Sequence, residues 1–181
     1  MIKSIKVCSK KDFTSLVRGL HILDSYNPDL PIKAYGQKYI FISIADPWNT
    51  PDSDKEKDYA NGKDSHLLPE GRCVLNLDFG DYSFVDGESP EKDCMTLEDA
   101  IKITNFIYRF ILFDEDEYKL VIHCSAGVSR SFTIGEFVQD IVFYHTTEKP
   151  PLKTNSVGYR NSYIRKLLED AVFGPETYKY F

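Results

Sequence analysis

Histidine, methionine and tryptophan are scarce in this sequence, and none of its apolar runs is long enough to cross a bilayer. The histidines and the four cysteines, which stand at positions 8, 73, 94 and 124, lack the spacing of metal ligands. Residues 1–7 lack the layout of a signal peptide. Because free thiols persist in a reducing compartment, we expect a cytoplasmic protein that uses no metal or other cofactor and binds no membrane.

Positive charge is also in deficit. The formal net charge of −6 argues against a nucleic acid as the main partner, and the sequence has no strongly basic stripe. Acidic side chains outnumber basic ones between Asp46 and Asp99, whereas the balance reverses in residues 149–181. We interpret the first segment as a solvated acidic face. The alternative is a surface that selects basic protein segments around a phosphorylated residue.

The chain has 181 residues, of which 42% are hydrophobic and 28% are charged. These values suit a soluble protein that is long enough to bury a core of its own. No internal repeat or low-complexity tract divides the chain. We therefore expect a single domain over residues 1–181 that works as a monomer.

Apolar runs bounded by turn residues alternate with stretches of helical periodicity. The expected strands are 2–7 (an edge strand by its alternation), 39–45, 73–79 and 119–123. The expected helices start at Ser9, at Thr96, after Arg130 and at Asn161. A loop or short bends are expected at 24–38, and loops at 48–71 and 82–95. Strands that alternate with helices predict an α/β fold, a three-layer sandwich in which helices flank a central, mostly parallel sheet.

Residues 120–131 form the most informative segment. A strand-like apolar run breaks into a loop of small side chains and resumes as a helix, with Cys124 at the head of the loop and Arg130 at its end. Such a loop aims backbone N–H groups at one point, to which the helix adds its positive end. We expect an oxyanion site that favours the thiolate form of Cys124, with the planar guanidinium of Arg130 gripping two phosphate oxygens.

The pattern His123-Cys124-x5-Arg130-Ser131 resembles the signature of the cysteine-dependent protein tyrosine phosphatase superfamily. The half from Ala126 to Ser131 is most similar to the dual-specificity branch. The resemblance implies the sandwich fold of that superfamily and hydrolysis through a phosphocysteine. The alternative interpretation is a buried structural cysteine followed by an arginine at this spacing by chance.

Each position of the motif has an expected role. Cys124 is the nucleophile, Ser131 donates a hydrogen bond to its sulfur when that sulfur leaves as a thiolate, and His123 braces the loop. Arg130 and the loop N–H groups neutralise the phosphoryl oxygens. The expected phosphate-binding residues are Ser125, Ala126, Gly127, Val128, Ser129 and Arg130.

A carboxylic acid must protonate the departing oxygen. We assign this role to Asp81, which follows a strand at the expected active end and is preceded by Gly80, whose flexibility lets the chain bend toward the phosphate. Asp93 is the alternative, because it lies closer to Cys124 in the chain, as in compact members of the family. Asp78 and Asp46 are weaker candidates that can equally end a strand or open a turn.

The expected activity is therefore hydrolysis of phosphomonoesters on proteins, with phosphotyrosine as the substrate and phosphoserine and phosphothreonine as further ones. The anion loop has no lysine, which argues against highly charged inositol lipids. Two alternatives stay open: a phosphatase of a nucleotide, an RNA end or a phosphoinositide, and a phosphate-binding module without turnover. The depth of the pocket decides whether phosphotyrosine alone is accepted or phosphoserine and phosphothreonine as well. This depth depends on loops 48–71 and 82–95.

Overall fold

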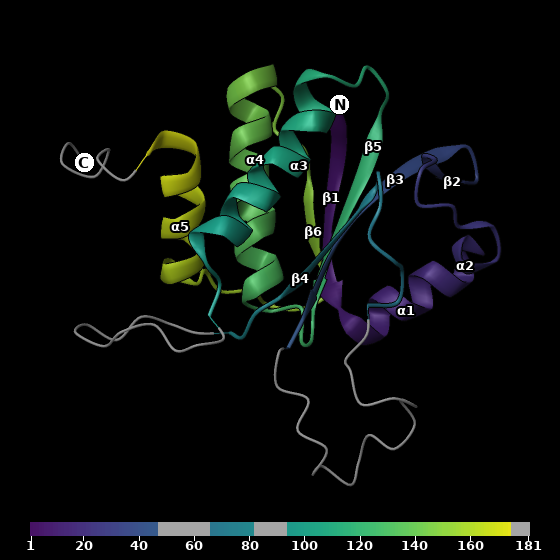
Figure 1. Ribbon diagram of the computed structural model, residues 1–181, viewed down its shortest axis with the longest axis horizontal. Helices are drawn as coiled ribbons and strands as arrows, with labels where there is room; N and C mark the ends of the chain where they lie inside the picture. Colours follow the sequence, from purple (N-terminus) through teal and green to yellow (C-terminus); the bar gives the residue numbers. More distant parts are fainter. Residues whose placement is uncertain (47–65, 82–93, 175–181) are drawn as a thin grey trace, which may run out of the picture.

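The computed structural model describes residues 1–46, 66–81 and 94–174. Strands and helices alternate along most of the chain (Figure 1). In order they are β1 (Ile2–Ser9), α1 (Lys10–Gly19), α2 (Ile22–Ser25), β2 (Ile32–Ala34), β3 (Gln37–Ala45), β4 (Val74–Asp78), α3 (Leu97–Leu112), β5 (Tyr118–Cys124), α4 (Arg130–Thr146), β6 (Leu152–Thr154) and α5 (Ser162–Phe173).

The strands form one mixed sheet of six, so the α/β class is confirmed. β5 lies between β3 and β1 and is parallel to both, and β6 continues the sheet beyond β1. β4 pairs in parallel with the second half of β3. β2 folds back antiparallel on the first half of β3 through a turn in which Tyr35 and Gly36 have positive φ, and this hairpin makes the sheet mixed.

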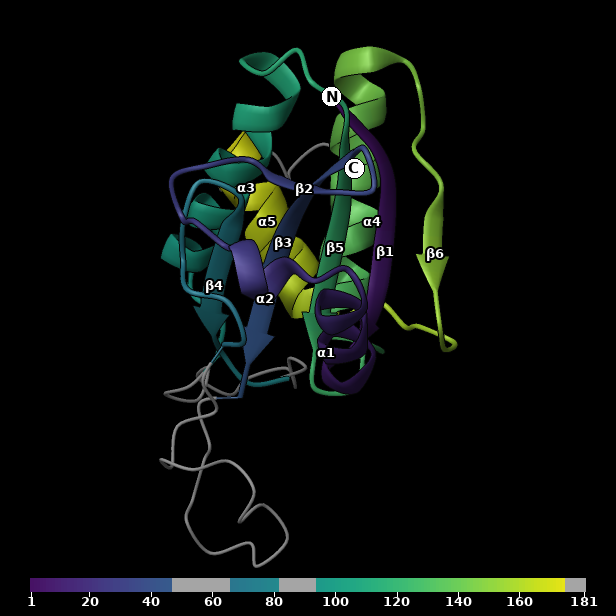
Figure 2. The same ribbon diagram turned by 90° about the vertical axis from the view of Figure 1, so that its right-hand side faces the viewer.

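Helices cover both faces of the sheet. α3, α4 and α5 lie on one face, and α1 and α2 lie on the other (Figures 1 and 2). Gly135 allows α4 to approach β1 closely, since a Cβ there would lie 2.7 Å from a methyl carbon of Val7. On the opposite face, Phe13 of α1 packs edge-on against Phe41 of β3, with ring centroids 5.4 Å apart.

Side-chain caps fix where three of the helices begin. Ser9 accepts a hydrogen bond from the backbone N–H of Asp12, and Asn161 caps α5 in the same way. Thr96 and Asp99 form a reciprocal capping box at the start of α3. None of the helices in the described residues combines the length and the apolar character that a membrane span requires.

Two local expectations were wrong, and the short strand β6 was not expected. β1 is an interior strand because β6 pairs beside it, although its sequence alternates like an edge strand. β6 follows two prolines and is too short to give a periodic signal. The segment 24–38, expected to be a loop, contains β2 and the end of α2, since pairing with β3 stabilises a strand that its own sequence hardly favours.

The register of the sheet brings its carboxyl ends to one edge. Cys124 at the end of β5 pairs with Ser9 at the end of β1. Ala45 at the end of β3 pairs with Asp78 at the end of β4. The residues that follow these strand ends therefore meet at this edge, where ligands bind in open α/β sheets.

Candidate active site

The loop between β5 and α4 is anchored from outside by its carbonyl groups. The carbonyl oxygens of Ser125, Gly127 and Val128 accept hydrogen bonds from Lys10 N–H (3.3 Å), Ser156 Oγ (3.4 Å) and Tyr159 N–H (3.0 Å), respectively. Because these carbonyl groups bond outward, the loop can present backbone N–H groups to its interior. The N–H of Gly127 does so, donating to the sulfur of Cys124 at 3.2 Å.

Gly127 is required at the tightest point of this loop. Its φ of +74° is a conformation that residues with a Cβ rarely adopt. A Cβ there would also lie 2.4 Å from the carbonyl carbon of Cys8, at the end of β1. The loop is therefore packed against the strand end, and its curvature depends on this glycine.

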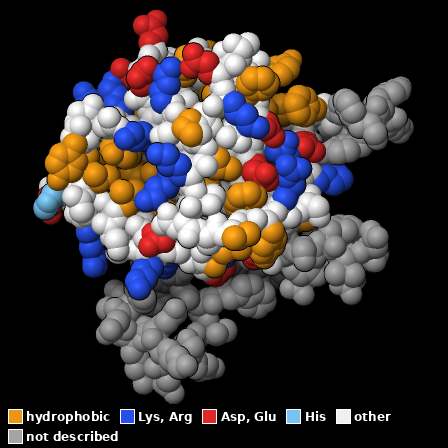
Figure 3. All heavy atoms as spheres, turned by 180° about the vertical axis from the view of Figure 1, so that it is seen from behind, with side chains coloured by type: hydrophobic (Ala, Val, Ile, Leu, Met, Phe, Trp, Pro, Cys, Tyr) orange, Lys and Arg blue, Asp and Glu red, His pale blue; other side chains and the backbone are white. Residues whose placement is uncertain are grey.

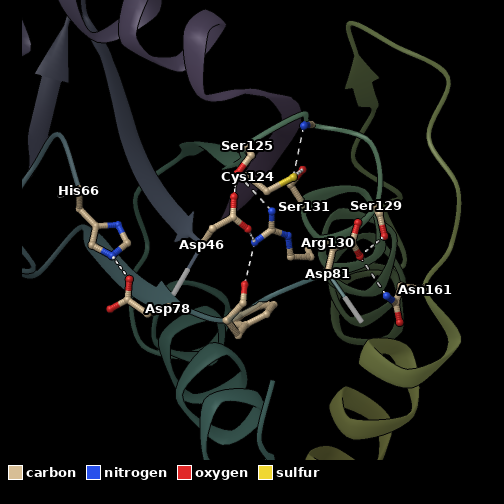
Figure 4. A network of polar contacts seen from close by, with 12 residues as sticks. Asp46, His66, Asp78, Asp81, Cys124, Ser125, Ser129, Arg130, Ser131 and Asn161 are labelled. Atoms are coloured by element: carbon tan, nitrogen blue, oxygen red, sulfur yellow. Dashed lines mark hydrogen bonds and ion pairs between the residues drawn. The ribbon is translucent and has the colours of Figure 1, made fainter. Parts of the chain in front are cut away.

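The sulfur of Cys124 lies inside the loop (Figure 4). The residue is 2% exposed, and its Sγ is 3.1 Å from Oγ of Ser131, in the first turn of α4. The N–H of Gly127, a hydroxyl that can donate and the positive end of a helix thus converge on the sulfur. All of them act to stabilise a negative charge there.

Arg130 is the first residue of α4 and is 4% exposed. Its Nη1 donates to the carbonyl of Phe79 at 2.7 Å, and its Nη2 donates to Oγ of Ser125 at 3.2 Å. Its buried Nε has no hydrogen-bond partner among the described residues. The guanidinium plane is therefore fixed beside the loop and keeps a donor for a further oxygen.

Asp46 lies directly on this arginine. One carboxylate oxygen is 2.6 Å from Nη1 of Arg130, and the other accepts a hydrogen bond from the hydroxyl of Ser125. The side chain is 35% exposed, so it lies at the mouth of the loop. The sequence offered Asp46 only as a weak candidate for the acid or as a turn residue, whereas the structure pairs it with Arg130, the expected phosphate-binding residue.

Asp81, the expected general acid, contacts the other end of the loop. Its Oδ1 accepts hydrogen bonds from Oγ of Ser129 (2.6 Å) and Nδ2 of Asn161 (3.1 Å), and its Oδ2 accepts one from the hydroxyl of Tyr159 (3.5 Å). The structure thus places Asp81 against the loop but holds it by three donors. Its role as the acid stays a prediction.

The remaining two acid candidates are Asp93 and Asp78. Asp93, the main alternative to Asp81, lies outside the described residues, as does most of the two loops expected to set pocket depth. Asp78 is exposed and bonds to Nε2 of His66 at 3.2 Å (Figure 4). This contact holds the carboxylate of Asp78 away from Cys124.

A polar chain supports the strand side of the loop. Nε2 of His123 and Nδ1 of His66 both lie 2.7 Å from Oγ of the buried Ser43. The ring of Phe13 stacks on His123 with centroids 4.1 Å apart. Burial lowers the pKa of His123 to about 3, and burial also lowers the pKa of His66. Near neutral pH His123 is therefore an uncharged, fixed support for the residue before Cys124.

Several residues of this site were missed from the sequence. Ser43 is a polar residue within an apolar strand, which was the available signal. His66 gave none, because its partners depend on the strand order. Asn161 was expected only as a helix start, yet its N–H also bonds to Thr133 of α4 at 2.8 Å while its side chain reaches Asp81. It thus joins α5, α4 and the loop.

The described residues contain no group of three or more histidine, cysteine or acidic side chains placed to hold a metal ion. Cys8, Cys73 and Cys124 are buried thiols that form no disulfide bond. No family model, curated protein or solved structure matches this chain. The interpretation of the site therefore depends on its own geometry.

Proposed function

We propose that this protein is a cysteine-dependent phosphatase with the three-layer, mostly parallel architecture of the protein tyrosine phosphatase superfamily. One observation carries the proposal: the buried sulfur of Cys124 receives the N–H of Gly127 inside a loop whose end fixes the guanidinium of Arg130. A nucleophile and a phosphate-binding cation are thereby held on one loop at the start of a helix.

In the first step the thiolate of Cys124 attacks phosphorus. The S–P bond forms, the bond from phosphorus to the leaving oxygen breaks, and that oxygen takes a proton from the carboxylic acid of Asp81. Arg130 and the loop amides stabilise the charge on the transferring oxygens from fixed positions, so little reorganisation is needed during the reaction. The product of this step is a phosphocysteine.

In the second step water attacks the phosphocysteine. The carboxylate of Asp81 accepts a proton from the water, a new O–P bond forms, and the S–P bond breaks. Cys124 leaves as a thiolate, which accepts the hydrogen bond of Ser131. The 3.1 Å separation between Sγ of Cys124 and Oγ of Ser131 fits that role. Inorganic phosphate is released, and the reaction consumes no oxidant or reductant.

The substrate that we favour is a phosphorylated protein, with phosphotyrosine as the main target and phosphoserine and phosphothreonine as further ones. No lysine lies in the loop from Ser125 to Ser129, so a polyphosphorylated ring gains no added cation there. The alternative is a non-protein phosphomonoester. We further propose that the protein acts as a cytoplasmic monomer without a cofactor.

Hydrolysis of p-nitrophenyl phosphate tests this proposal. Wild-type protein should turn the substrate over at an unchanged rate after treatment with a chelator, and Cys124→Ser should abolish turnover. Cys73→Ser is the matched control, because Cys73 is also buried but lies before β4, away from the loop. Turnover that survives Cys124→Ser, or that Cys73→Ser abolishes equally in folded protein, would refute the assignment.

A panel of substrates at equal concentration separates the substrate classes. We expect phosphotyrosyl peptides to be hydrolysed faster than nucleotides, RNA ends or phosphoinositides. Saturable binding of phosphate without any turnover would instead identify a binding module. Faster hydrolysis of a non-protein member of the panel would establish the alternative phosphatase.

A further inference from the structure

A groove of about 710 Å³ lies far from the candidate active site, on the face of the sheet that carries α1. Its floor is formed by the first halves of β1, β3 and β5, whereas Cys124 lies at the opposite strand ends. α1 crosses the half of this face near Cys124, and the hairpin of β2 and β3 passes over the other half (Figure 2), where Gly36 and Gln37 line the groove. Leu16, Tyr39 and Val121 give the groove an apolar component.

Lysine side chains from four strands surround this groove. They are Lys3, Lys6, Lys38, Lys119 and Lys153. Lys3 pairs with Glu117 and Glu148, and Lys38 pairs with Asp116. The other three make no ion pair with any residue in the described parts of the chain. In the view from behind, basic side chains gather around a hydrophobic area on the side of α1 and α2 (Figure 3).

Two of these lysines are placed unfavourably for the isolated protein. Lys6 of β1 and Lys153 of β6 are direct register partners in adjacent strands. Like charges opposite each other across strands are destabilising. Lys119 lies in the neighbouring strand β5, opposite Ser4 and two residues before the register partner of Lys6. The sheet therefore concentrates positive charge in a protein of net charge −6. A bound anionic group would offset this repulsion.

The shape of the groove constrains the ligand. From β3 to β6 it crosses three strand spacings, a width of about 14 Å, which is more than one phosphate group occupies. Its lining combines apolar surface with lysines, which suits a chain in which acidic and apolar side chains alternate. The net charge of −6 would repel a long nucleic acid.

We infer that this groove docks an extended acidic segment of a partner protein. The inference is independent of the proposed phosphatase activity, because it depends on residues at the other end of the sheet. This site could not be predicted from the sequence, because the lysines around the groove are far apart in the chain. The strand order β3-β5-β1-β6 brings them together.

Fluorescence anisotropy with a labelled peptide tests the inference. The probe is a glutamate-rich peptide with interspersed leucines, about eight residues long, or about 26 Å when extended. We expect saturable binding that weakens as salt is added. Lys6→Glu/Lys153→Glu should weaken binding at least about tenfold, because two charges at the groove are reversed. Lys11→Glu/Lys33→Glu is the matched control, with the same charge change at exposed lysines outside the groove, and should keep the affinity.

Absence of saturable binding at low salt, or equal weakening by both double variants, would overturn the inference. Tighter binding of a single-stranded oligonucleotide of similar length would overturn the assigned partner class. Turnover of p-nitrophenyl phosphate serves as a control, which the groove variant should leave unchanged because the groove is remote from Cys124. Failure of the docking inference is thereby distinguished from failure of the phosphatase proposal.

The single variant Lys153→Glu separates binding from folding. Replacing the opposed lysines by an ion pair should raise the melting temperature of the free protein while it lowers the affinity for the glutamate-rich peptide. A higher melting temperature with unchanged affinity would show that the lysine pair affects only the fold, and the inference would fail.

Discussion

Asp46 and Asp81 contact different residues of the segment from Cys124 to Arg130, and their contacts give them different expected roles. Asp46 contacts the guanidinium of Arg130 and the hydroxyl of Ser125, so it acts on the groups that would bind phosphate. Asp81 contacts Ser129 and Asn161 at the other end of the loop. The proposed mechanism needs one carboxyl group that gives a proton to the leaving oxygen, and for that step we retain Asp81.

The dependence of rate on the leaving group distinguishes these aspartates. Phenyl phosphate needs protonation of its leaving oxygen far more than p-nitrophenyl phosphate does. Asp81→Asn should therefore lower kcat on phenyl phosphate by about 100-fold or more, and on p-nitrophenyl phosphate by much less. Asp46→Asn should change both substrates by a similar factor, because it acts through Arg130. Steady-state kinetics on both substrates measure the difference.

If only Asp46→Asn selectively slows the hydrolysis of phenyl phosphate, the role of general acid belongs to Asp46. Equal, small effects of both variants on both substrates would leave Asp93 as the acid, which Asp93→Asn then tests on the same two substrates.

At the scale of single elements, the loop between β5 and α4 and the helix after it were predictable from sequence. The residues that define them are contiguous in the chain. Cys124, Gly127 and Arg130 lie within one short segment whose strand–loop–helix pattern is local. Asp46 and His66 were not predictable in the same way. Their contacts with Arg130 and Ser43 exist because β3 lies beside β5 and β4 beside β3, and the sequence does not state this order.

Gly127→Ala tests how far the loop depends on its local conformation. A positive φ and contact with the backbone of Cys8 both oppose a Cβ. We expect a loss of about 1–3 kcal/mol in the free energy of unfolding, together with a fall in turnover larger than that of other glycine variants. Gly19→Ala is the control, since a Cβ there meets nothing within 4 Å. Urea unfolding and p-nitrophenyl phosphate turnover measure both effects, and equal behaviour of the two variants would contradict the account.

At the scale of the whole molecule, the sequence predicted the α/β class and most of the long elements, because their apolar periodicity is strong. It did not predict the short strands β2 and β6, whose formation depends on their neighbours. For the same reason it placed β1 at an edge. The groove that the lysines surround is a further consequence of strand order, and no local sequence pattern predicts it.

Global stability should fall in acid because His123 is buried. Its folded-state pKa of about 3 lies below the ordinary value of 6.5, so between these values the unfolded chain binds a proton that the folded chain does not. The stabilisation is present above pH 6.5 and is lost as the pH falls toward 3, by up to about 1.4 kcal/mol per pH unit.

Urea unfolding at a series of pH values measures this effect. His123→Asn removes the titrating ring and should flatten the decline between pH 6.5 and 4, whatever its effect on stability at neutral pH. His21→Asn is the control for the loss of an exposed histidine. An unchanged decline in His123→Asn would show that other groups cause the acid sensitivity.

The central claim is that the sulfur of Cys124 takes the phosphoryl group inside its loop, and trapping that species tests it most directly. Ser131→Ala removes the hydroxyl 3.1 Å from the sulfur and should slow breakdown of the intermediate about 10- to 100-fold. Acid quenching of this variant during turnover of p-nitrophenyl phosphate, followed by peptide mass spectrometry, should then find one phosphoryl group on Cys124. Turnover with no phosphoryl group on Cys124, or with the group on another residue, would contradict the account.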